Sequence, residues 1–150
     1  MDEKKLFSTS EEAEKAFYAA FQQEDLELMM SVWANDEDIT CIHPGGNRLE
    51  GQTLIRESWE QIFRHENGIK FEINQKKVSI ENDIAIHHVI ESIYMGGGLQ
   101  SEIIATNVYR KSHDCWYMIL HHASPELRPA LIAADEDNLE EQDEENKTFH

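Results

Sequence analysis

Residues 39–46 read ITCIHPGG and separate an N-terminal helical segment from a longer, mainly β-rich segment. The run from Ile39 to His43 has the apolar and β-branched composition of a short strand. Pro44 and the two glycines that follow end it, because neither residue type continues a strand well. The stretch therefore predicts a short strand that holds His43 at its carboxyl end.

Two helices are predicted before this strand. Residues 8–23, STSEEAEKAFYAAFQQ, carry apolar side chains at spacings of three and four. Ser8 has the spacing of a capping box with Glu11, although Ser10 could cap instead. Residues 25–34, DLELMMSVWA, form the second predicted helix, with Asp25 as its N-cap.

One helix and a series of strands are predicted after it. Residues 52–66 place large apolar side chains on one helical face. Four β-rich segments separated by short turns follow at 69–80, 84–95, 100–111 and 115–123. Helices followed by long strands indicate an α+β fold, a cone-shaped curved antiparallel (mixed) sheet with three N-terminal helices packed on its concave face.

The charge of the chain excludes some partners. The 150 residues contain 13 Lys and Arg against 30 Asp and Glu, a net charge of −17. Such a surface repels nucleic acid and anionic membranes, because binding to either needs basic side chains. We therefore predict no nucleic-acid or membrane partner.

The chain carries no membrane-spanning or signal-peptide pattern. No apolar run approaches about 20 residues, and the N-terminal MDEKKLFSTSEEAEK lacks an apolar core. Cys41 and Cys115 lie far apart and are predicted to be free buried thiols, with a disulfide between them as the alternative. These features predict a cytoplasmic protein.

The charge also suggests where the domain ends. Residues 135–150 carry eight acids and one lysine, a net of −7, and few large apolar side chains. We predict a domain over residues 1–134 and an acidic, disordered tail over 135–150, which serves solubility.

Three segments resemble one protein superfamily in order and spacing. They are FYAAFQQEDLELMMSVWANDEDI (17–39), HPGGNRLEGQTLIRESW (43–59) and WYMILHHASP (116–125). Together they resemble the nuclear transport factor 2-like or SnoaL-like superfamily over about residues 8–125. The last segment also resembles the association domain of calcium/calmodulin-dependent kinase II. The resemblance implies a fold that hosts isomerases, dehydratases, cyclases, binding proteins and assembly domains, so function depends on the site.

The ketosteroid isomerase branch of this superfamily gives a residue-by-residue comparison. Its general-base aspartate, which precedes a proline, falls on His43. Its oxyanion-donor tyrosine falls on Phe17 and its protonated aspartate on Ala105, and neither can stabilise an enolate oxygen. The resemblance therefore leaves His43 as a candidate general acid or base but argues against steroid isomerisation by that mechanism.

The same comparison predicts which side chains face the pocket, since alternate residues of a strand share a face. The second long strand would turn Ile86, His88, Ile90 and Ser92 inward. The third would turn Ile103, Ala105, Asn107 and Tyr109 inward, and the fourth Trp116, Met118, Leu120 and His122. The opposite set would face solvent or a partner: His87, Glu91, Glu102, Arg110 and His121. A slip of one residue would invert these predictions.

We therefore predict a small-molecule site with His43 as the catalytic residue. The predicted substrate-binding residues are Trp33, Trp59, Phe63, His88, Asn107, Tyr109, Trp116 and His122. We predict no cofactor and no metal, because no H-x-H or H-E-x-x-H spacing occurs. A binding or assembly module without catalysis is the alternative.

The resemblance also implies a homodimer formed through the open face of the sheet. Val89, Ile93, Ile104 and Val108 would otherwise leave an apolar face exposed.

Overall fold

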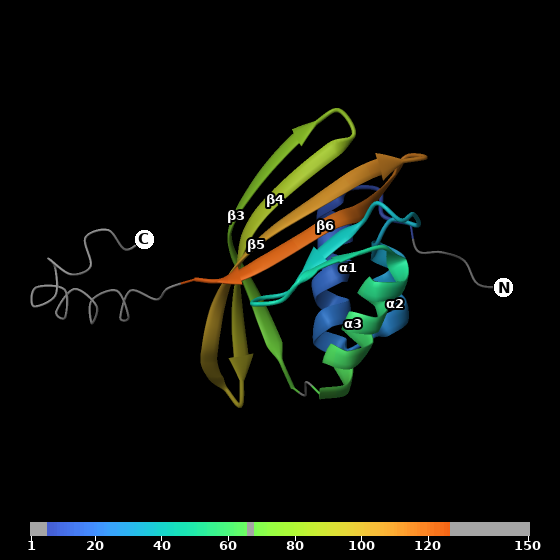
Figure 1. Cartoon of the computed structure of the whole chain (residues 1–150). Helices are drawn as coiled ribbons and strands as arrows, with labels where there is room; N and C mark the ends of the chain where they lie inside the picture. Colours follow the sequence, from blue (N-terminus) through green and yellow to red (C-terminus); the bar gives the residue numbers. More distant parts are fainter. Residues whose placement is uncertain (1–5, 66–67, 127–150) are drawn as a thin grey trace, which may run out of the picture.

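The computed structural model describes residues 6–65 and 68–126. Three helices pack on one face of a curved sheet, and the long strands extend past them (Figure 1). The helices are α1 (Ser10–Gln23), α2 (Leu26–Val32) and α3 (Gln52–His65). The predicted α+β architecture is thus confirmed, and the predicted acidic tail lies outside the described residues.

The sheet contains six strands in the described ranges, in the order β2-β1-β6-β5-β4-β3. The four long ones are β3 (Lys70–Glu81), β4 (Ile84–Met95), β5 (Gly98–Ser112) and β6 (Cys115–Pro125). The short β1 (Thr40–Ile42) runs parallel to β6, which makes the sheet mixed. The sequence did not predict β2 (Arg48–Glu50), which pairs with β1 across the Pro-Gly turn.

The helix caps agree with the sequence in part. Asp25 caps α2, as predicted, by accepting a hydrogen bond from the Leu28 amide. The cap of α1 is Thr9, rather than Ser8 or Ser10, because its hydroxyl accepts from the Glu12 amide. The Glu12 carboxylate in turn accepts from the Ser8 amide, so the predicted capping interaction exists one residue further along.

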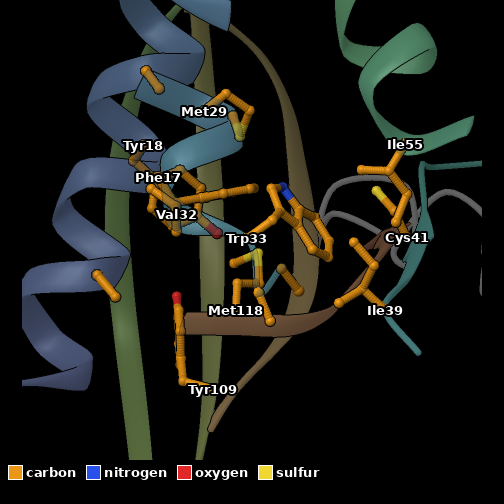
Figure 2. Close-up of a cluster of buried hydrophobic side chains, with 14 of the residues drawn as sticks. Phe17, Tyr18, Met29, Val32, Trp33, Ile39, Cys41, Ile55, Tyr109 and Met118 are labelled. Carbon is orange, nitrogen blue, oxygen red and sulfur yellow. The ribbon is translucent and has the colours of Figure 1, made fainter. Parts of the chain in front are cut away.

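The core lies between the helices and the inner face of the sheet. Figure 2 shows the indole of Trp33 in its centre, close to Met118 and Ile39. In another part of the core, the Phe17 ring of α1 packs edge to face on Trp59 of α3, with ring centroids 5.6 Å apart. These contacts fix all three helices to one sheet face, because aromatic rings bury more apolar area than any other side chains.

A β-bulge in β6 decides which histidine of the pair 121–122 faces the core. Val108 pairs with Leu120 whereas Tyr109 pairs with Met118, so Ile119 is an extra residue in β6. Trp116 and Met118 face inward before the bulge, as predicted. After it the alternation reverses, and His121 and Ala123 face inward.

The predicted inward orientation of His122 is therefore wrong, and so is that of His88. His122 is exposed on the outer face because of the bulge. From Ala85 to Glu91 the buried residues of β4 are Ala85, His87, Val89 and Glu91, the parity opposite to the predicted one, and Ser92 beyond them is also buried. The prediction that Val89 faces outward is wrong for the same reason.

We predict that alanine at positions 121 and 122 has very different effects on stability. His121→Ala should lower the free energy of unfolding by about 2–4 kcal/mol, because it removes a buried ring and a hydrogen bond. His122→Ala, the matched control, should change it by about 0.5 kcal/mol or less, as at other exposed sites. Urea denaturation at low protein concentration, where association contributes little, measures both. An equal loss in the free energy of unfolding for the two variants would contradict the position of the bulge.

Candidate functional site

His43 follows β1 and lies against helix α3. Its ring packs edge to face on Trp59, with centroids 4.8 Å apart. Its Nε2 lies 3.0 Å from Ser58 Oγ and 3.6 Å from Cys41 Sγ. The turn at Pro44 and Gly45 thus directs the ring onto α3 instead of into solvent.

These contacts define the protonation of His43. Ser58 Oγ donates its single proton to the Ile55 carbonyl at 2.7 Å, so it accepts from His43 Nε2–H. Nδ1 then holds the lone pair, and it has no hydrogen-bond partner within the described residues. Burial lowers the pKa of His43 to about 4, because it disfavours the charged imidazolium. At neutral pH His43 is a neutral ring with a free proton-accepting nitrogen.

His121 lies next to His43 in the interior, with ring centroids 6.5 Å apart. Burial, together with the nearby His43 and His122, lowers its pKa to about 3. A neutral His121 donates from Nδ1 to Asn107 Oδ1 at 2.6 Å. His121 therefore connects the His43 end of the core to a second group of buried polar side chains.

That second group surrounds the carboxylate of Glu14, which projects from α1 into the sheet. Glu14 Oε2 accepts from Asn107 Nδ2 at 3.1 Å and from the Tyr109 hydroxyl at 3.2 Å. His87 Nδ1 lies 3.1 Å from the same oxygen, and Lys76 Nζ lies 3.1 Å from Oε1. Burial alone would raise the pKa of Glu14, but His87, Asn107 and Lys76 outweigh it and lower the pKa. Glu14 is thus an ionised carboxylate in the interior.

Glu91 is the second buried carboxyl group, and its environment acts in the opposite direction. It lies on β4 and accepts a 2.6 Å hydrogen bond from the Tyr18 hydroxyl. Burial, with a smaller contribution from the charge of Glu14, raises its pKa to about 7 despite that hydrogen bond. Asn107 Nδ2 donates to Tyr18 at 3.0 Å and so joins the two carboxyl groups. Buried acids whose pKa values are driven apart in this way are typical of acid–base sites.

A cavity of about 360 Å³ opens beside this group, between α1 and β3. Glu14 and Tyr18 line its inner part, and Lys76 spans it by pairing with Glu11 at 2.8 Å. The other lining residues are Glu12, Lys15 and Ile73. His43 does not line this cavity. The volume suits a small ligand.

The sequence-predicted site residues divide into two groups. Those buried on the inner side, or partly buried against it, are Trp33, Trp59, Phe63, Asn107, Tyr109 and Trp116. His88 and His122 lie on the outer face instead. The places of the isomerase oxyanion donors, Phe17 and Ala105, are both fully buried in the core.

The sequence reasoning missed Glu14, Tyr18, His87 and Glu91. One signal could have found Glu14, because it stands three residues before Phe17 on the buried side of α1. A glutamate in that position needs a partner, since a lone buried carboxylate is costly.

Metal and membrane features are absent from the part of the chain that the structure describes. There, no three His, Cys, Asp or Glu side chains are grouped so that they could hold a metal ion. No helix in the same residues has both the length and the apolar character needed to cross a membrane. Cys41 and Cys115 are free thiols, as predicted, although only Cys41 is fully buried.

A family model for the SnoaL-like domain matches residues 11–128. The chain belongs to the SnoaL-like family. A protein from Thiobacillus denitrificans, assigned to the calcium/calmodulin-dependent protein kinase type II association domain, is 38% identical, with a TM-score of 0.79 over 82% of this chain and 99% of that one. A nuclear transport factor 2-like protein from Streptomyces avermitilis, assigned as a dehydratase, is 33% identical, with a TM-score of 0.70 over 77% and 92%.

Two further matches are more distant. A ketosteroid isomerase-like structure from Shewanella frigidimarina shares the fold at 20% identity, with a TM-score of 0.64 over 75% of this chain and 91% of that one. The F-box protein SKIP8 of Arabidopsis thaliana is 27% identical over 108 residues. That alignment covers 72% of this SnoaL-like chain but 46% of the plant protein.

We predict that Glu91 makes stability fall as the pH rises. Its pKa is raised from 4.5 in the unfolded chain to about 7 in the fold, so its contribution is complete below about pH 4.5 and is lost as the pH rises through 7. Relative to the wild type, Glu91→Gln should therefore gain up to ~3 kcal/mol between about pH 4.5 and 8. Urea denaturation across this range measures the difference. Exposed Glu72→Gln is the control, and a Glu91→Gln difference that does not change with pH would contradict the assignment.

Proposed function

We propose that this SnoaL-like domain binds a small molecule in the cavity between α1 and β3, with the buried polar group as the inner wall of the site. Glu14 and Tyr18 carry this proposal, because each lines the cavity and also belongs to the hydrogen-bonded network that contains Glu91. Burying two carboxyl groups costs several kcal/mol, and well-packed apolar side chains would stabilise the core as well or better. A role in binding accounts for their presence.

The charges of the cavity restrict the ligand. Three glutamates and two lysines line it, and Lys76 is held between Glu11 and Glu14. A carboxylate ligand would meet net negative charge. A neutral hydroxyl or amide compound, or a small amine, fits better, because each can donate a hydrogen bond to Glu14 or to the hydroxyl oxygen of Tyr18, whose own proton goes to Glu91.

His43 is proposed as a proton acceptor beside this network, where its ring lies 6.5 Å from that of His121 between centroids. Its neutral ring and its unpaired Nδ1 support this role. An isomerase, dehydratase or hydrolase would each use such a group, and the relative from Streptomyces avermitilis is assigned as a dehydratase.

The ligand proposal predicts selective thermal stabilisation. Neutral, cationic and anionic fragments of matched size are screened, and hits should come from the neutral and cationic sets, because a ligand that binds only the folded state raises Tm. Tyr18→Phe should lower the affinity for each compound found in the screen roughly tenfold, because it removes one hydrogen bond. Glu27→Gln, whose side chain pairs with Arg56 on the surface, is the control.

Two results would contradict this prediction. One is a screen without hits, and the other is a set of hits that Tyr18→Phe and Glu14→Gln leave unchanged. Each hit is also tested for turnover, and an equal rate in His43→Ala would remove the catalytic role of His43 while leaving the binding site intact.

Assembly is the second candidate function, favoured by the 38% identity to a structure assigned as a kinase association domain. We propose that two copies associate through the outer face of the sheet. Ile86 and Ile104 support this surface. They lie on the outer face of the neighbouring strands β4 and β5, and they are 36% and 39% exposed.

A further inference from the structure

The outer face of the sheet is unusually apolar on β4. Its outward side carries Ile84, Ile86 and Ile90 beside His88 and Ser92, whereas its inward side carries His87 and Glu91 beside Ala85 and Val89. The solvated side of an antiparallel strand is usually the polar one. The outward isoleucines are therefore placed as if another surface covered them.

Strand pairing arranges the outer side chains in three rows of three around Thr106. The rows are Ile86–Val108–Leu120, His88–Thr106–His122 and Ile90–Ile104–Ser124. None of the nine is an acid, a lysine or an arginine. Thr106 has a histidine on each side, and five of the six side chains in the rows above and below are aliphatic, the sixth being Ser124.

This uncharged centre fits a second copy of the chain. At a net charge of −17, two copies repel each other unless they meet where charge is absent. A twofold interface must also be complementary to itself, and an uncharged, mainly aliphatic grid can pack against a copy of itself. Other partners would not require that symmetry.

We infer that a second copy docks with its twofold axis at Thr106, so that His88 and His122 make the association sensitive to acid. This inference rests on the dimer proposed above. If the twofold axis runs along the strands, His88 of one copy faces His122 of the other copy. If the axis runs across the strands, each histidine faces the same histidine of the other copy. Both arrangements place two histidine pairs in the interface, where sheets pack about 10 Å apart.

The charged groups around the histidines strengthen this effect. Lys77 on β3 pairs beside His88, and Ile42 of β1 separates His122 from Arg48 on β2. On β5, Glu102 and Arg110 lie on the outer parity four residues to either side of Thr106. Lys77 thus stands at one end of the histidine row, and at the other end Arg48 is paired with Glu50 at 3.6 Å. Protonated histidines would meet like charge within one copy and across the interface, in a region that loses water on docking.

The test measures mass by light scattering during gel filtration at about pH 7.5 and about pH 5.5. The wild type should be a dimer at the higher pH, with an association constant at least roughly tenfold lower at the lower pH. His88→Gln with His122→Gln should stay dimeric at both. Glu91→Gln should behave like the wild type, which separates interior titration from the interface. Ile104→Glu should be monomeric, with circular dichroism reporting its fold.

The outcomes separate the two proposals. A wild-type association constant that is equal at the two pH values, or a double glutamine variant whose association weakens as much as that of the wild type, would overturn the histidine switch and leave the dimer standing. A dimer that survives Ile104→Glu would place the interface elsewhere and overturn the inference. A wild type that is monomeric at both pH values would overturn the switch and the proposed dimer together.

Discussion

The ionised carboxylate of Glu14 is the constraint around which the interior is organised. It projects from α1 into the sheet, where Asn107 and Tyr109 of β5 donate to it and His87 of β4 faces it. An uncompensated charge in this position would be very costly, so helix and sheet must keep one relative placement. The network extends through Tyr18 to Glu91 and through Asn107 to His121, which lies beside His43. Glu14, Glu91 and His121 are therefore parts of one hydrogen-bonded network, and His43 lies beside it.

This constraint also accounts for the isoleucines on the outer side of β4. The strand must turn His87 and Glu91 toward the network, and its period of two then places Ile86 and Ile90 outside. The proposed ligand site and the proposed docking surface thus both depend on one strand register. A shift of β4 by one residue would bury the isoleucines, but it would remove Glu91 from Tyr18. Neither the proposed ligand site nor the proposed docking surface would then form.

The sequence predicted most of the architecture because helix periodicity, turn residues and strand segments are local signals. It placed Asn107, Tyr109 and Trp116 on the inner face correctly, since β5 and the first part of β6 alternate regularly. It failed at His88 and His122 for two different reasons. The facing taken from the isomerase comparison is off by one residue on β4, where apolar residues occur on both sides, and the extra residue Ile119 reverses the alternation in β6. Both depend on pairing between strands, which a single sequence does not display. Glu91 was missed with β4, because a glutamate on a strand ordinarily indicates the solvent side.

The state of the two buried carboxyl groups is best measured by NMR of the Glu14 and Glu91 side-chain carbons during a pH titration of the whole chain. Glu91 should titrate near pH 7, as expected from its burial next to an ionised Glu14. Glu14 should stay ionised to below its ordinary value of 4.5. Two carboxyl groups that titrate together near 4.5 would mean that both are solvated and that the interior network does not exist.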